Sequence, residues 1–238
     1  MKIFFIDTET TGNTQNDRLC QLAVKERGVV KPIVSALYKP PVPISIDSMA
    51  VHHITERHVA DRPQFMAASE YATIKEILEG DEGIVVAHNA PFDIGHLSRE
   101  GIRPKRAICT MKVAQALDPE ENIPSYRLQY LRYLLGIDIE ASAHDALGDV
   151  LVLEELFERL LEKVKTTTAE EDAAIEQMLK MSSEPRLIHS FRFGKYNGRK
   201  IADIAREDRG YLEWLFREKS KQPEEEADWL YTLDRYLK

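Results

Sequence analysis

Two acidic residues follow the first apolar stretch of the chain, which begins MKIFFIDTETTG. Asp7 and Glu9 come after residues 2–6, whose apolar character predicts a short buried strand. Two carboxylates at such a strand end repel each other and raise each other's pKa unless a cation lies between them. A solvated turn over residues 10–12 explains the same pattern, and a chain with 40 acids contains about seven acid-x-acid pairs by chance. A metal site is therefore only one interpretation of this pair.

Asp93, His144 and Asp149 extend this pattern along the chain. Asp93 opens a predicted helix after a predicted strand at 83–88, and Asp149 lies in the first turns of the strongest predicted helix, residues 145–165. Each acid has a structural explanation, because a carboxylate near a helix N-terminus stabilises the helix dipole. However, ligand sites in α/β proteins collect where strands end and several loops converge. A shared site is the alternative explanation.

The elements that must position these residues form a predicted mixed α/β domain. Apolar stretches bounded by turn residues predict strands, and apolar residues at helical spacing predict helices. The expected elements are strands 2–6, 19–26, 32–38 and 83–88, and helices 65–80, 92–99, 109–117, 127–135 and 145–165. Residues 1–165 are thus predicted to form one domain, polar residues 166–185 a linker with one short helix, and residues 186–238 a small second module.

The ordered set Asp7, Glu9, Asp93, His144 and Asp149 resembles the DEDDh class of 3′→5′ exonucleases, the family of the proofreading epsilon subunit of DNA polymerase III. Three segments also resemble the two-part exodeoxyribonuclease X group of that family: SMAVHHITERHVADRP (48–63), ICTMKVAQAL (108–117) and FRFGKYNGRKIADIAREDRGYLEWLF (191–216). The resemblance implies a ribonuclease H-like fold, in which a mixed sheet is flanked by helices, followed by a small C-terminal α+β module.

The resemblance also implies two Mg²⁺ or Mn²⁺ ions per active site, held by Asp7, Glu9, Asp93 and Asp149. Such hard cations prefer oxygen ligands, and two ions about 4 Å apart can stabilise both the attacking and the leaving oxygen in phosphodiester hydrolysis. His144 is then the expected general base, because an intrinsic imidazole pKa of about 6.5 allows it to accept a proton at neutral pH. Acids would follow the first strand because metal ions lie between them.

The same resemblance places five further residues near the terminal nucleotide: Thr8, Thr10, Thr11, His53 and Phe92. Judged alone, Phe92 fits a core aromatic residue and His53 a partly buried loop histidine. One position departs from the family pattern, because Asn13 follows the glycine where many relatives place an apolar residue that presses against a terminal base. This departure leaves both paired ends and single strands as candidate substrates.

A basic and aromatic stretch begins the C-terminal module. Residues 185–201 carry five cations, no acid and three aromatic residues, a local charge of +5 in a chain whose net charge is −8. Asn197 and Gly198 predict a type I′ hairpin within it. A solvated basic edge is one interpretation, and DNA binding by phosphate neutralisation and base stacking is the other. The second interpretation predicts DNA contacts from Arg192, Lys195, Tyr196, Arg199 and Lys200, with Trp214 in the core of the module.

The composition excludes several classes of protein. Hydrophobic residues make up 43% of the 238 residues, which suffices for a sizeable core. No stretch approaches the roughly 18 consecutive apolar residues of a membrane span, and the N-terminus lacks a secretory leader. Cys20 and Cys109 lie far apart without the spacing of a metal site, which suits a reducing compartment. A cytoplasmic location is therefore expected.

These observations predict a metal-dependent 3′→5′ exodeoxyribonuclease that releases 5′-mononucleotides from DNA ends in repair or proofreading. The alternatives are an exoribonuclease of the same class and a non-catalytic subunit that binds nucleic acid or a polymerase. A pure binder has no reason to concentrate acids where phosphate must lie, which argues against the non-catalytic subunit. The expected partners are DNA, a DNA polymerase or repair proteins, and a second copy of the chain in a homodimer; no membrane is expected.

Overall fold

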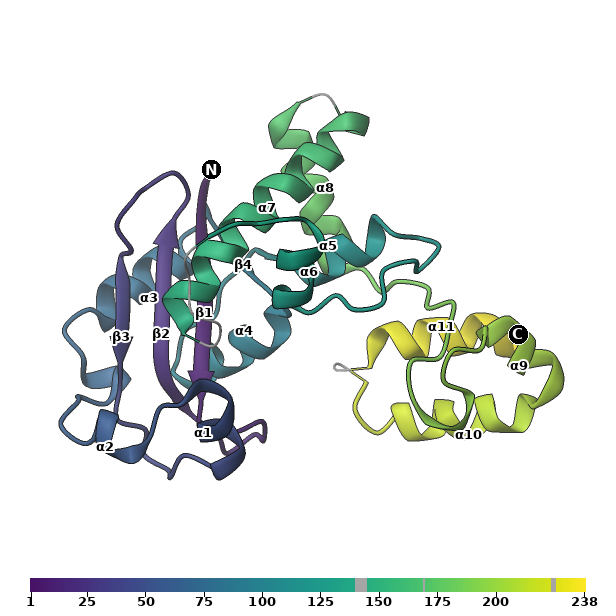
Figure 1. Ribbon diagram of the computed structural model, residues 1–238, viewed down its shortest axis with the longest axis horizontal. Helices are drawn as coiled ribbons and strands as arrows, with labels where there is room; N and C mark the ends of the chain where they lie inside the picture. The colour runs from purple at the N-terminus through teal and green to yellow at the C-terminus, as the bar shows by residue number, and fades with distance from the viewer. Residues whose placement is uncertain (140–144, 169, 224–225) are drawn as a thin grey trace.

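The computed structural model describes residues 1–139, 145–168, 170–223 and 226–238, and its centre is a five-stranded mixed sheet with helices on both faces (Figure 1). The strands are β1 (Lys2–Thr10), β2 (Leu19–Glu26), β3 (Val34–Leu37), β4 (Gly83–Ala87) and β5 (Ala107–Cys109). Their order is β3-β2-β1-β4-β5; β2 is antiparallel to both β1 and β3, and β4 is parallel to both β1 and β5. The acids of β1 therefore lie on the central strand.

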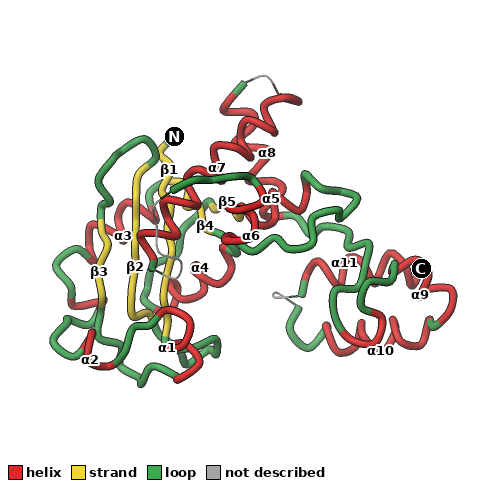
Figure 2. The backbone as a smooth tube through the Cα atoms, viewed as in Figure 1, coloured by secondary structure: helices red, strands yellow, loops and turns green. Residues whose placement is uncertain are grey.

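Helices connect the later strands, as Figure 2 shows by colour. The chain between β3 and β4 forms α1 (Ile46–His52), α2 (Glu56–Val59), the 3₁₀ turn η1 (Phe65–Ala67) and α3 (Tyr71–Glu79). α4 (Ala90–Arg99) connects β4 to β5, and α5 (Thr110–Ala116), α6 (Leu128–Leu134), α7 (Ala146–Thr168) and α8 (Glu171–Ser183) follow. The predicted helix 65–80 is thus divided in two, and β5 was not predicted because its three residues are too few to form a pattern.

Alternating residues of β1 face two different hydrophobic cores. Phe5 packs edge to face against Phe157 of α7, with ring centroids 5.4 Å apart. Phe4 lies in the opposite core, which includes residues of α3 and α4. Because side chains alternate along a strand, Asp7 and Glu9 continue the face that α7 covers.

β1 extends beyond its predicted end at residue 6. Asp7 and Glu9 lie within the strand and pair with β2, and the register shifts only between Glu9 and Thr10. The prediction that the strand ends before the acids is therefore wrong. Thr8 and Thr10 are β-branched and buried on the opposite face, so the strand continues through both acidic positions.

Residues 166–185, predicted as a linker with one short helix, complete α7 and form α8. Ala174, Ile175 and Met178 of α8 are buried in the same core as the inner face of α7. The backbone N–H of Cys109 in β5 donates to the hydroxyl of Ser182 at 2.9 Å. α8 therefore packs against the α/β domain, beside α7 (Figure 1).

The C-terminal module packs around a hydrophobic core of its own, separate from the two cores of the sheet. Its helices α9 (Ile201–Glu207), α10 (Arg209–Lys219) and α11 (Ala227–Leu237) surround the buried Phe191. Among its described residues, β structure is limited to a bridge between Ser190 and Lys200. Trp214 is 46% exposed, so the expectation that it lies in the core is wrong.

The turn at Asn197 and Gly198 differs from the predicted type I′ turn. Asn197 has φ −50° and ψ 128°, and Gly198 has φ +84°. The N–H of Arg199 donates to the carbonyl oxygen of Tyr196 at 2.9 Å, which completes a type II turn. The prediction is wrong because the preceding 3₁₀ turn, η2 (Gly194–Tyr196), makes the connection longer than a two-residue hairpin loop.

Polar contacts join the module to the α/β domain. Lys112 of α5 lies 3.6 Å from Asp228 of α11, and Arg186 lies 3.3 Å from Glu121. These pairs connect segments whose apolar residues belong to separate cores. In the described part of the chain, none of the helices has the length and apolar character needed to cross a membrane.

Candidate active site

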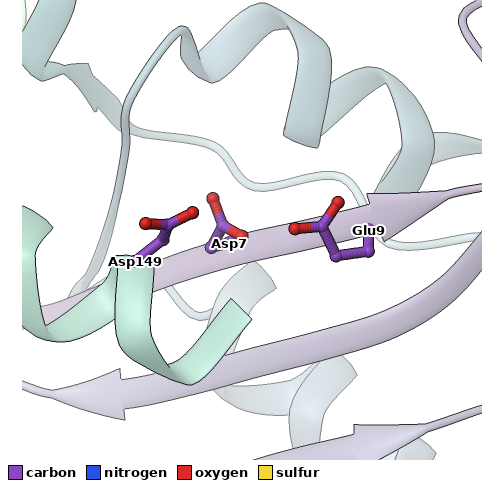
Figure 3. Close-up of side chains that lie close together, drawn as sticks. All are labelled: Asp7, Glu9 and Asp149. Atoms are coloured by element: carbon purple, nitrogen blue, oxygen red, sulfur yellow. The ribbon is translucent and has the colours of Figure 1, made fainter. Parts of the chain in front are cut away.

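Three carboxyl groups from two elements converge beside the sheet (Figure 3). Asp7 and Glu9 project from β1, and Asp149 projects from the first turn of α7 toward them. Each supplies a ligand oxygen that lies within 4.8 Å of the other two. The structure thus brings together three of the four predicted metal ligands.

Burial and mutual repulsion raise the pKa values of these acids. The pKa of Asp7 is raised well above its usual range, first by burial and then by the charges of Asp93, Asp149, Glu9 and Asp145. The pKa of Glu9 is raised to about 8, again first by burial and then by neighbouring acids. The ion pairs among the described residues involve acids other than Asp7 and Glu9. Neither carboxyl group therefore has a cationic partner among the residues that the structure describes.

Asp93 is held by Thr8, its neighbour across the helix–strand contact. Oδ1 of Asp93 accepts hydrogen bonds from the Thr8 backbone N–H (3.1 Å) and hydroxyl (2.8 Å). Burial raises the pKa of Asp93 to about 7, and these hydrogen bonds act in the opposite direction. Asp93 is outside the group of three converging oxygens, although its charge acts on both Asp7 and Glu9.

Sequence reasoning missed three polar residues that surround the acids, Gln129, Gln21 and Asp145. Gln129 of α6 donates from Nε2 to Oδ1 of Asp149 at 2.5 Å. Gln21 of β2 donates to Oδ1 of Asp145 at 3.0 Å, and the charge of Asp145 raises the pKa of both acids on β1. Amide side chains on distant elements form no motif, so the sequence carried no signal for the two glutamines.

This arrangement fits a divalent metal ion. Two ionised carboxylates 4.8 Å apart repel each other by roughly 3 kcal/mol at an effective dielectric constant of about 20. A divalent cation with oxygen ligands would offset this repulsion. Within the described residues the cluster contains neither cysteine nor histidine, which favours a hard cation over a thiolate- or imidazole-bound metal.

His144, the predicted general base, lies outside the described residues. Two other histidines, the half-buried His88 after β4 and the buried His96 of α4, have structural partners. His88 donates from Nε2 to the carbonyl oxygen of Tyr126 at 2.7 Å, and burial lowers its pKa to about 4. His96 packs on the ring of Phe92, and burial followed by the charge of Arg99 lowers its pKa to about 4. Neither of these two is positioned like a base beside the three acids.

The three predicted substrate threonines use their hydroxyl groups within the protein. The Thr8 hydroxyl donates to Asp93, that of Thr10 donates to the carbonyl oxygen of Gly12 at 2.9 Å, and that of Thr11 donates to Asp17 at 2.7 Å. All three side chains are buried. Their hydroxyls therefore hold the acids and the following loop in place, and a contact between them and a nucleotide stays a prediction.

A pocket of about 560 Å³ adjoins Glu9. Phe92 lines this pocket and is half-buried. His53, the other predicted substrate residue, is exposed with φ +60° and ends α1. His52 lines the pocket in its place, with Nε2 donating to the carbonyl oxygen of Thr10 at 3.1 Å.

The loop after β1 closes tightly around Asp17. Its carboxylate accepts hydrogen bonds from Thr11 (2.7 Å) and from the backbone N–H of Thr14 (2.7 Å). A Cβ on Gly12 would lie 2.7 Å from this carboxylate, so a larger residue would displace Asp17 from these hydrogen bonds. Asn13 consequently lies at the edge of the pocket beside Glu9.

Most of the predicted DNA contacts in the C-terminal module have partners within the protein. Lys195 pairs with Asp208 at 3.0 Å, and the hydroxyl of Tyr196 donates to the same carboxylate at 2.5 Å. Arg199 pairs with Glu207 at 2.7 Å. The sequence analysis counted charges only over residues 185–201, so it did not include Glu207 and Asp208, the two acids that pair with these cations.

Arg192 has a different role from the other cations. Its guanidinium donates to the carbonyl oxygens of Pro124 (2.8 Å) and Ile123 (3.0 Å) and lies over the ring of Tyr126 at 5.2 Å. It therefore attaches the module to the segment before α6. Lys200 is exposed at the start of α9 and stays a predicted DNA contact.

The mixed sheet and the acids on its central strand define the class of this protein. A family model described as an exonuclease matches residues 4–157, more than half of the chain. The chain therefore belongs to the exonuclease family, in which metal dependence is general. A second model, described as exodeoxyribonuclease X-like C-terminal, matches residues 191–220.

Individual relatives define the group more narrowly. Exodeoxyribonuclease 10 of Escherichia coli K12 is 34% identical over 217 residues, 89% of each chain. The DNA polymerase III subunit epsilon of Pasteurella multocida is 30% identical over 168 residues, 64% of this chain and 65% of that subunit. The solved structure of exonuclease X in complex with 5′ overhanging duplex DNA has a TM-score of 0.59 and 29% identity, covering 76% of this chain and 99% of that one. The predicted family and the ribonuclease H-like fold are confirmed.

Proposed function

We propose that this exonuclease removes 5′-mononucleotides from the 3′ ends of DNA in a metal-dependent reaction. The observation that carries the proposal is the convergence of Asp7, Glu9 and Asp149 within 4.8 Å, with no protein cation paired to the two acids of β1 among the described residues. The names of the relatives, which include an exodeoxyribonuclease and a DNA polymerase subunit, support DNA as the substrate.

The proposed cofactor is a pair of Mg²⁺ or Mn²⁺ ions held by Asp7, Glu9, Asp149 and Asp93. When bound, such ions polarise the phosphate and stabilise the charge on the attacking and leaving oxygens. Gln129 orients Asp149 through its 2.5 Å hydrogen bond to Oδ1. Thr8 holds Asp93 in the same way from the opposite face of β1.

His144 is the proposed proton acceptor for the attacking water. It directly precedes Asp145 and the helix that carries Asp149, so it belongs to the same chain segment as a metal ligand. The pocket beside Glu9 is the proposed site of the terminal nucleotide, where the half-buried ring of Phe92 offers a surface for its base or sugar.

The test is digestion of a 5′-labelled DNA oligonucleotide by the wild-type protein and by Asp7→Ala. We expect the wild-type protein to shorten the DNA from its 3′ end in Mg²⁺ or Mn²⁺ and to stop in EDTA. Asp7→Ala should fold but release no nucleotide, whereas Asp61→Asn, which alters an exposed acid, should retain full activity. Unchanged digestion by Asp7→Ala would refute the assignment.

Two further measurements separate the remaining alternatives. Matched DNA and RNA oligonucleotides should be digested at different rates, with DNA faster; a preference for RNA would assign an exoribonuclease. His144→Ala should lower the rate by about 10²–10⁴-fold, the usual contribution of a general base. Metal binding measured by calorimetry should change little in this variant, which distinguishes a base from a ligand.

A further inference from the structure

A second pocket, of about 470 Å³, lies between the α/β domain and the C-terminal module. Residues of α4 and α5 line one side, and the first turn of α11 lines the other. Asn13 and Phe92 line both this pocket and the pocket beside Glu9. The two pockets therefore adjoin. A nucleic-acid strand that extends from the catalytic acids past Phe92 would enter the space between the α/β domain and the C-terminal module.

The charges around this second pocket favour an anion. Three cations, Arg99, Lys112 and Arg186, and two acids, Glu226 and Asp228, line it. Lys219 pairs with Glu226 at 2.5 Å, which neutralises that acid. This excess of positive charge stands out in a chain whose net charge is −8.

Arg99 and Lys112 are the cations best placed to bind a ligand. Arg99 has no acidic partner among the described residues; its Nη1 donates to the carbonyl oxygen of Asp17 at 3.4 Å and lies 3.0 Å from Nδ1 of His96. Among the described residues, the acidic partner of Lys112 is Asp228 at 3.6 Å, which Arg186 shares at the same distance. Arg186 also pairs with Glu121 at 3.3 Å, so Asp228 and Glu121 balance Lys112 and Arg186, and the net positive charge of the pocket comes from Arg99.

Trp229 supplies an aromatic surface on the module side of the pocket. Its ring stacks on Phe191 with centroids 5.6 Å apart and an interplanar angle of 25°, and it meets the edge of Phe193 at 5.2 Å. These neighbours fix the orientation of the indole, while its half-buried side chain still lines the pocket. Proteins bind single-stranded nucleic acids by combining aromatic side chains with cations. The bases stack on the aromatic rings, and the cations contact the phosphates.

We infer that the single strand upstream of the 3′-terminal nucleotide binds in this second pocket, with a base on Trp229 and phosphates at Arg99 and Lys112. This inference rests on the proposed function, since it assumes that the terminal nucleotide lies beside Glu9. It assigns the DNA contact of the module to the first turn of α11, because the cations predicted from residues 192–199 are largely paired within the protein.

The experiment uses the fluorescence of Trp229 in the full-length protein. The chain contains two tryptophans, so Trp214→Phe leaves Trp229 as its single indole. Asp7→Ala in EDTA prevents turnover and removes part of the negative charge near the substrate. A ten-residue oligothymidylate and thymidine monophosphate are titrated at equal nucleotide concentration, and the anisotropy of a 5′-labelled oligothymidylate reports binding independently.

We expect the oligonucleotide to quench Trp229 saturably and the mononucleotide to leave it unchanged. Arg99→Gln and Lys112→Gln should each weaken binding by about tenfold, the equivalent of one charge-assisted contact. Each should also make the plot of log K against log salt concentration shallower by about 0.7. Arg57→Gln, which alters an exposed arginine on α2, is the matched control and should change neither value.

Three results would overturn the inference. The oligonucleotide could bind by anisotropy without quenching Trp229, the mononucleotide could quench as strongly, or Arg99→Gln could behave like Arg57→Gln despite a native circular dichroism spectrum. Digestion assays keep the two proposals apart. Normal 3′→5′ digestion by the wild-type protein without quenching of Trp229 would support the proposed function and refute this inference. Quenching of Trp229 without any digestion would refute the proposed function and leave DNA binding in the second pocket supported.

Discussion

Replacement of Glu9 by glutamine should stabilise the metal-free protein while it abolishes catalysis. Burial and the neighbouring acids raise the pKa of Glu9 from 4.5 to about 8. The folded protein therefore binds this proton more tightly than the unfolded chain does, and the free energy of unfolding falls as the pH rises from 4.5 to 8. Glutamine carries no charge at any pH and removes this loss.

The expected magnitude follows from the size of the pKa shift. Such a shift corresponds to about 4 kcal/mol at pH 8, and entry of water and protonation of Asp7 should reduce it to roughly half. A gain of about 2 kcal/mol raises the Tm of a chain of this length by roughly 4–8 °C. At pH 5 the gain should be under about 1 kcal/mol, because this pH is only about half a unit above the ordinary pKa of 4.5, at which the loss begins.

Thermal unfolding by circular dichroism in EDTA at pH 5 and pH 8 is the assay. Glu76→Gln, which alters an exposed glutamate of α3, is the control and should leave the Tm unchanged at both values. Addition of Mg²⁺ should raise the Tm of the wild-type protein more than that of Glu9→Gln, because the variant has lost a ligand. A Tm for Glu9→Gln at pH 8 equal to or below that of the wild-type protein would refute the electrostatic reasoning.

Three further predictions concern the supports of the site. Gln129→Ala removes the hydrogen bond to Asp149 and should lower metal affinity by about 10–100-fold, measured by calorimetry. Gly12→Ala places a Cβ 2.7 Å from the Asp17 carboxylate and should destabilise the protein by about 1–3 kcal/mol in urea unfolding. A chain truncated after residue 165 loses the buried face of α8, about 5 kcal/mol of apolar burial, and should unfold at a much lower temperature than one truncated after residue 185, which we expect to stay folded.

The sequence predicted the acids of the site better than their supports. Asp7, Glu9 and Asp149 were identified because the order of the acids along the chain resembles the DEDDh exonucleases, whereas each acid judged alone also had a structural explanation. Gln129 is an ordinary polar residue in a helix, so nothing in the sequence marks it. Its contact with Asp149 becomes visible only when α6 and α7 are packed together. The hydrogen bonds that Thr8 gives to Asp93 likewise depend on how α4 packs against β1, which no spacing encodes.

Elements were predicted well where the hydrophobic pattern was long and poorly where it was short or diluted. The strand of residues 19–26 was placed at its observed bounds because all but its last residue are buried. The segment 166–185 was predicted as a linker because of its polar composition, although Ala174, Ile175 and Met178 share one helical face. Short β5 and the turn at Gly198 depend on tertiary pairing and on backbone geometry that composition does not fix.

Rising ionic strength should weaken the contacts between the α/β domain and the C-terminal module at a lower salt concentration than it unfolds either of them. The contacts of Lys112, Arg186 and Arg192 across the junction depend on charge or on charged donors, whereas each part keeps a separate apolar core. Dissolved salt screens such contacts beyond about 8 Å at physiological concentration and more closely above it. We therefore expect a concentrated salt solution to separate the C-terminal module from the α/β domain while both stay folded. The protein would then bind single-stranded DNA more weakly.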